Sequence, residues 1–122
     1  MADKFTITVN GKEQEVKMTF GMLNALCKTL GDVDRASQLT IDVEVMNEVM
    51  ITLLSPRDSK GKIIEELDID TMEVDGNEVM ELLAWAGNHA LDFFLKGLER
   101  AKGLQDQHMP RVKALTPSLS GS

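Results

Sequence analysis

The segment from Asn77 to Gly103 constrains the fold of this chain more than any other feature of the sequence. Wound as a helix, it carries apolar residues around well over half of its circumference, and a polar strip with Trp85 in its middle occupies the rest. The centre of the apolar arc comprises Val79, Leu82, Leu83, Ala86, Ala90, Phe93, Phe94, Gly97 and Ala101. Because this arc is so wide, we expect the helix to need two packing partners. The second partner is either another element of this chain or a different protein.

The composition predicts a soluble cytoplasmic protein of one domain. The chain has 122 residues and a formal charge of -7, with 20 acidic against 13 basic side chains. This balance argues against nucleic acid as a partner, because binding to phosphates depends on Lys and Arg, and it disfavours an anionic membrane surface as well. No apolar run reaches the ~20 residues that span a bilayer, and the N-terminus has no apolar signal segment. The single cysteine, Cys27, excludes an internal disulfide and is typical of a reducing compartment.

The first twenty residues predict a β-hairpin. Apolar and polar residues alternate from Phe5 to Val9, and Asn10-Gly11 is the dipeptide that best suits a type I′ turn. With a two-residue loop, Phe5 faces Val16 and Ile7 faces Gln14, so the apolar residues share one face. An isolated hairpin is only marginally stable in water, and this face therefore has to rest on helices.

Two shorter amphipathic helices precede the long one. Thr19 can cap the first, which holds Leu23, Leu26, Cys27 and Leu30 at helical spacing and ends at Gly31. The second carries the stripe Val43, Met46, Val49, Met50, Leu53 and Leu54 and ends at Ser55-Pro56. Residues 32–39 are a short polar connection or a helical turn, residues 55–62 an exposed loop, and residues 63–76 a short helix or an extended stretch.

These elements predict an α+β fold, with the N-terminal hairpin packed on about three main helices. The predicted domain covers residues 1–103. Residues 104–122 contain two prolines and no periodic apolar stripe, and we expect a flexible C-terminal tail there.

No group of residues has the spacing of a catalytic or metal site. To bind calcium, the acidic stretch from Asp68 onward would need oxygen ligands, a glycine and a glutamate at fixed positions of a loop. Neither a loop that starts at Asp68 nor one that places Gly76 at the glycine position provides them. His89 and Asp92 do not form the repeated Glu-x-x-His motif of a di-metal bundle, and Cys27 has no histidine placed to activate it. We therefore expect no cofactor and no enzymatic activity.

Several residues are candidates for binding a partner protein instead. Methionine is adaptable and frequent at binding surfaces, and Met46 and Met50 share one stripe, although core filling explains them too. Trp85 either lies over the stems of Glu78 and Glu81 or serves as a binding anchor. The acids from Glu65 to Asp75 are either a solvated surface or a site for a basic partner. The candidate partner-binding residues are Met46, Met50, Leu54, Trp85, Leu91, Phe94 and Leu95.

Three segments resemble the tail assembly chaperones of long-tailed bacteriophages: FTITVNGKEQEVKMTFGMLNALCK, VMITLLSPRDSKGK and LLAWAGNHALDFFLKGLERAKG. The likeness covers roughly residues 5–103 and rests on the order of the elements and on the apolar helices. It implies a non-enzymatic protein of the infected host cytoplasm, absent from the mature virion. Such a protein binds the tape measure protein and keeps it soluble while tail tube subunits assemble around it. The family offers no site residues to transfer.

The resemblance also implies, in many phages, a longer frameshifted form that contacts the tail tube protein. The alternative interpretation is a structural virion component or a small homodimeric adaptor, in which the second apolar face packs against another copy. Self-association is compatible with both. A chaperone should become soluble in complex with its client, whereas a self-packing dimer should be indifferent to that client.

Overall fold

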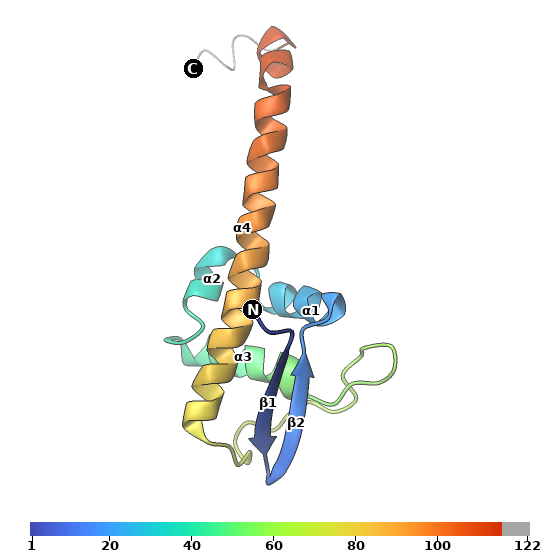
Figure 1. The fold of residues 1–122 in the computed structure, drawn as a ribbon, viewed down its shortest axis with the longest axis vertical. Helices are drawn as coiled ribbons and strands as arrows, with labels where there is room; N and C mark the ends of the chain where they lie inside the picture. Colours follow the sequence, from blue (N-terminus) through green and yellow to red (C-terminus); the bar gives the residue numbers. More distant parts are fainter. Residues whose placement is uncertain (116–122) are drawn as a thin grey trace. The chain divides into compact units, whose positions relative to one another are not determined.

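The computed structural model describes the backbone of residues 1–115 and the side chains of residues 1–104. It begins with a two-stranded antiparallel hairpin, β1 (Lys4–Val9) and β2 (Lys12–Lys17), shown in blue in Figure 1. Asn10 and Gly11 have φ angles of 51° and 77°, as a type I′ turn requires. The pairing of Phe5 with Val16 and of Ile7 with Gln14 confirms the predicted register. Ile7, Val9 and Val16 are buried on one face.

Three helices follow, each preceded by a side chain that caps it. Helix α1 (Phe20–Leu30) begins after Thr19, whose hydroxyl accepts the Met22 N–H at 3.1 Å, and ends at Gly31 with a φ of 86°. This confirms the predicted cap and stop. Residues 32–39, left open between a connection and a helical turn, contain the short helix α2 (Val33–Ser37), capped by Asp32. Helix α3 (Val43–Leu54) is capped by Asp42, which the sequence analysis did not single out.

Helices α1 and α3 pack against each other and support the hairpin. Their contact includes a hydrogen bond of 2.8 Å between the hydroxyls of Thr29 and Thr52, in a region where Leu26, Leu30 and Val49 are fully buried. The side-chain amide of Gln14 on β2 donates to the Leu54 carbonyl at 3.1 Å. The hairpin therefore satisfies one of the terminal carbonyls that α3 cannot pair internally.

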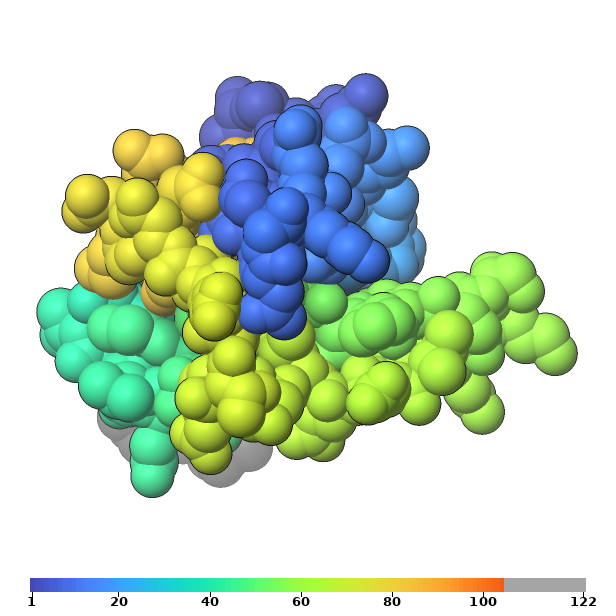
Figure 2. All heavy atoms as spheres, turned by 90° about the horizontal axis from the view of Figure 1, so that it is seen from below, coloured from blue at the N-terminus to red at the C-terminus, as the bar shows by residue number. Residues whose placement is uncertain are grey.

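The chain after α3 is irregular and stands at the surface, in green and yellow-green in Figure 2. It is held at a few points. The Ser55 hydroxyl accepts the Leu67 N–H at 3.0 Å, and Asn10 exchanges two hydrogen bonds of 2.8 Å with the backbone of Glu73. Val74 forms an isolated bridge with Val9. Residues 63–75 therefore form neither a helix nor a strand: they are irregular, with a turn at residues 69–71, so the structure shows neither of the two predicted alternatives.

The long helix α4 (Gly76–Leu115) starts by closing the core. Leu82, Leu83, Ala86 and Ala90 are fully buried at helical spacing, as the sequence predicted. Gly87 allows a close approach, because a Cβ atom there would lie 3.2 Å from Cδ2 of Leu39. These contacts belong to the first of two compact units, Met1–Asp92.

The second compact unit comprises Phe93–Ser122. Its helical part continues to Leu115, twelve residues beyond the predicted end of the helix at Gly103. Residues 105–115, expected to belong to the flexible tail, therefore have a helical backbone. Gln, Lys, Arg, Ala and Leu are frequent there, and these residues favour helix in spite of Pro110. The last part of the predicted tail, residues 116–122, lies outside the described residues. No helix in the described part of the chain is both long and apolar enough to cross a bilayer.

Candidate functional site

The structure places the seven candidate partner-binding residues in different environments. Met50 and Leu54, on α3, are core residues, with only 5% and 2% of their surface exposed. Their assignment to a binding surface was wrong for this conformation, because α1 and the hairpin cover the stripe of α3 that carries them. Met46 lies on the same helix and is half-buried. The apolar stripe of α3 is therefore mainly a core feature.

Trp85 is half-buried and bonded to the N-terminal segment. Its indole Nε1 donates to the Ala2 carbonyl at 2.7 Å, and its ring lies 5.6 Å from that of Phe5. His89, one turn further along α4, stacks edge-on against Trp85 at 5.2 Å and approaches the same oxygen at 2.8 Å through Nε2. Trp85 therefore packs against the N-terminal segment, a contact that neither of the two predicted alternatives named. The N-terminal residues and β1 cover this side of α4.

The cluster around Trp85 also identifies a second packing partner for α4 within the chain. The face of Leu82, Leu83 and Ala86 closes the core, while the side with Trp85 and His89 meets the N-terminal segment. This contact is made by the polar side of α4, with Trp85 at its middle, and not by the apolar arc. The second packing partner predicted for the arc therefore stays a prediction.

A small hollow remains on the first unit beside α4. It has a volume of about 200 Å³ and is lined by residues of α2, the turn after it and α4, among them Leu39, Gly87 and Leu91. Leu91, one of the predicted candidates, is half-buried there. The hollow lies where the absent side chain of Gly87 lets the Leu39 side chain approach. Its size suits a single side chain rather than a cofactor.

The second unit carries the largest group of exposed apolar side chains on a single helix. Phe94 is half-buried, and Leu95 is 50% exposed. Three further residues, which the sequence analysis did not assign to the binding surface, join them: Phe93, Leu98 and Leu104, with 42%, 58% and 57% of their surface exposed. The aromatic rings of Phe93 and Phe94 meet edge-on at 6.5 Å. We call Phe93, Phe94, Leu95, Leu98 and Leu104 the α4 apolar surface.

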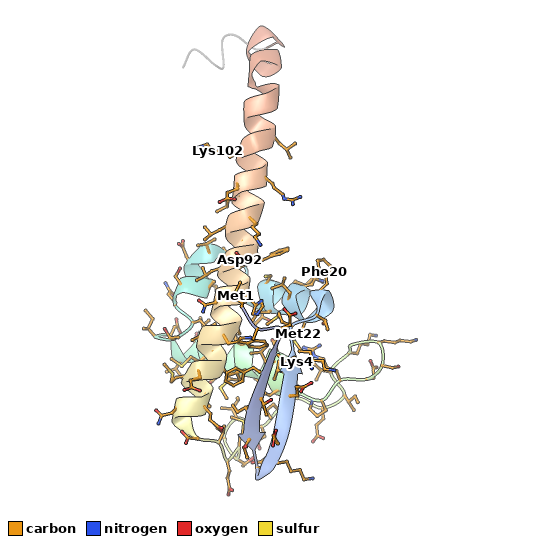
Figure 3. The ribbon with its side chains drawn as sticks, in the orientation of Figure 1. Met1, Lys4, Phe20, Met22, Asp92 and Lys102 are labelled. Carbon is orange, nitrogen blue, oxygen red and sulfur yellow. The ribbon has the colours of Figure 1, made fainter. Side chains whose placement is uncertain are left out.

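Helical spacing explains how these residues form a surface. At 100° per residue, Phe93 and Leu104 lie on one edge, Phe94 and Leu98 near the centre, and Leu95 on the other edge of an arc of about 200°. Polar side chains occupy the remainder: Lys96, Glu99 and Arg100. Lys102, labelled in Figure 3, falls inside the arc, near the edge formed by Leu95. Sequence reasoning had placed Phe93 on the core face, but Ala90 is the last buried residue of α4 among the side chains described, which end at Leu104. The periodicity alone does not say where along the helix its packing partners stop.

The titratable side chains form no recognisable reactive centre in the described part of the chain. Burial raises the pKa of the Cys27 thiol, which makes it a poorer nucleophile at neutral pH. His89 is engaged with the Ala2 carbonyl. Among residues 1–104, no group of three or more His, Cys, Asp or Glu residues is placed to hold a metal ion.

Comparisons with known proteins add no relative to this description: no family model, no curated protein and no solved structure matches the chain. The candidate site is therefore defined by its own geometry, which is an exposed apolar helical surface and not a pocket with polar groups. Surfaces of this kind bind other proteins, and an amphipathic helix of the partner is a common occupant.

Proposed function

We propose that this protein is a non-enzymatic tail assembly chaperone of a bacteriophage. It binds the tape measure protein and keeps this long helical client soluble in the host cytoplasm while tail tube subunits assemble around it. The observation that carries the proposal is the α4 apolar surface, on which Leu95, Leu98 and Leu104 each expose half or more of their side chain. The resemblance of residues 5–103 to this family gives the identity of the client.

Exposure of the α4 apolar surface to water is unfavourable in free energy. Burial of apolar area contributes about 25 cal/mol for each Å², so several exposed leucines and phenylalanines on one helix favour association. A helical client with its own apolar stripe can pack against them side by side. The neighbouring Arg100 and Lys102 favour a client helix that carries acidic residues beside its apolar stripe.

The second candidate function is a small homodimeric adaptor or structural virion component. The same observation favours it, because the α4 apolar surface can equally be covered by the same surface of another copy. The two functions differ in their response to the client. The oligomers or aggregates of a chaperone should dissociate when the tape measure protein is present, and a soluble complex should form. The dimer of an adaptor should be unaffected by the tape measure protein.

The test is co-expression with the tape measure protein encoded by the same phage, followed by measurement of soluble client and co-purification. The wild-type chain should raise the soluble client, and Leu95→Gln with Leu98→Gln should abolish this effect without a change in its own melting temperature. Ile41→Gln with Val43→Gln is the matched control, because it also replaces two exposed aliphatic residues, in the first unit. If both double variants retain the client equally well, the α4 apolar surface does not bind it.

A further inference from the structure

A cleft of about 290 Å³ lies between α1 and the loop that follows α3, residues 55–62. Met22, labelled in Figure 3, and Ala25 give it apolar walls on α1. Three cationic side chains line it as well: Lys28 from α1, and Arg57 and Lys60 from the loop. We call these three residues and their surroundings the cationic cleft.

The residues that line the cationic cleft carry three positive charges and no negative charge. No Asp or Glu is among the residues that line it, and α1 contains none. Residues 55–62 contain one acid, Asp58, which does not line the cleft and whose Oδ1 accepts the backbone N–H groups of Lys60 and Lys62 at 2.8 and 3.0 Å. Among residues 1–104, neither ion pair involves Lys28, Arg57 or Lys60. In a chain with 20 acidic side chains this is a local excess of positive charge.

Arg57 is held in place by neutral groups. Its Nη1 donates to the Gly61 carbonyl and its Nη2 to the Thr52 carbonyl, both at 2.7 Å. These bonds fix the guanidinium and stabilise the C-terminal end of α3, but they leave its charge uncompensated. Its Nε is buried and has no hydrogen-bond partner among the described residues. The cleft therefore presents one cation held by hydrogen bonds, Arg57, and two exposed cations, Lys28 and Lys60.

The same unit presents the opposite charge a few residues further along the chain. Six acidic residues without an intervening base occupy this segment, and all six are exposed: Glu65, Glu66, Asp68, Asp70, Glu73 and Asp75. The segment is fixed to the body by the hydrogen bonds at Leu67 and Glu73, so its acids are displayed from an ordered backbone. The apolar residues between the acids are half-buried, so the acids are the side chains that this segment displays.

We propose that the cationic cleft receives the acidic segment, residues 65–75, of a second copy of this chain. A molecule with both surfaces is complementary to itself, and a two-fold arrangement forms the contact twice. The net charge of -7 on each copy opposes association at long range. At about 0.1 M salt the Debye length of ~10 Å screens that distant repulsion, while close contacts between opposite charges persist.

Sedimentation velocity of the full chain over a range of concentrations tests the proposal. At about 0.1 M salt the protein should form a dimer that dissociates at about 1 M salt, because the contact is electrostatic. Association through the α4 apolar surface would persist at high salt. This difference separates the present inference from the proposed chaperone function, which can fail or hold independently of it.

Charge reversal locates the contact. Lys28→Glu with Lys60→Glu, and separately Glu65→Lys with Glu66→Lys, should each weaken self-association more than about tenfold by placing like charges together. A mixture of the two double variants should associate again, since each supplies the surface that the other lacks. Lys4→Glu with Lys12→Glu, an equal change of charge on the hairpin, is the control and should leave the dimer intact.

Melting curves of the variants are the control for folding, and each variant should fold because the replaced side chains are exposed. The proposal is overturned if the wild-type chain stays monomeric at about 0.1 M salt. It is also overturned if the Lys28 and Lys60 variant associates like the wild type, or if the mixture fails to restore association.

Discussion

Trp85 on α4 donates a hydrogen bond of 2.7 Å to the carbonyl oxygen of Ala2, although the two residues are 83 positions apart. His89 approaches the same oxygen at 2.8 Å, and Phe5 lies against the indole ring. One backbone carbonyl thus ties the N-terminal segment to two successive turns of α4. These contacts give Trp85 a structural role.

The first prediction concerns Trp85. Trp85→Ala should lower the free energy of unfolding by about 2–3 kcal/mol, which is below the range for fully buried aromatic residues because the ring is half-exposed. Trp85→Phe keeps most of the ring contact and loses the hydrogen bond, so it should cost ~1 kcal/mol. Urea unfolding of both variants measures the difference. An unchanged midpoint for Trp85→Ala would mean that the N-terminal segment contributes nothing to stability.

The second prediction separates the two parts of α4. Leu82→Ala removes a fully buried side chain and should cost ~2–5 kcal/mol of unfolding free energy. Phe93→Ala should cost only about 1 kcal/mol, because 42% of this side chain is already exposed. The measurement is the same urea titration. Equal losses for the two variants would show that Phe93 is buried in solution and would remove it from the α4 apolar surface.

Local signals predicted the elements of this fold well. Asn10-Gly11 determined the turn and with it the register of the hairpin, and Thr19 and Gly31 determined the ends of α1. In each case a single residue type suits a backbone conformation that few others tolerate. Such signals need no knowledge of tertiary contacts, and the structure confirms them.

The candidate site could not be predicted in the same way, because exposure depends on contacts between distant segments. The periodicity of α4 is the same on both sides of Asp92, yet Leu83 is buried and Leu98 is not. The contact of Trp85 with Ala2 likewise depends on where β1 lies. Met50 and Leu54 share a stripe with Met46, and only the position of α1 and the hairpin shows that they are core residues.

The third prediction concerns Cys27. Burial raises the pKa of its thiol above the usual value, which means that ionisation is less favourable in the folded protein than in the unfolded chain. The neutral thiol therefore favours the folded state below the unfolded pKa, and this contribution is lost as the pH rises through the folded pKa. Alkylation of Cys27 at neutral pH should be slower than that of a free cysteine peptide. With Cys27→Ser, the free energy of unfolding should decrease less steeply as the pH is raised into the alkaline range. An equally steep decrease would mean that other titrating groups cause it.

The last prediction concerns the two compact units. The large fully buried side chains all belong to residues up to Leu83, and the last buried apolar residue among the described side chains is Ala90. Truncation after Gly103 should therefore leave the melting temperature within a few degrees of that of the whole chain. Truncation after Asp92 should also leave a folded first unit, with its hairpin and core intact, since the units divide at that residue.

The two truncations should differ in client capture. The shorter one lacks every residue of the α4 apolar surface, while the one ending at Gly103 retains all of it except Leu104. Co-expression with the tape measure protein should give soluble client with the longer form and none with the shorter form, and thermal melts of both should be alike. A large loss of stability on removing residues 104–122 would mean instead that Val112 or Leu115 contributes to the folded protein. Client capture by the form ending at Asp92 would place the binding surface on the first unit, where the exposed pair Ile41 and Val43 is the next surface to test.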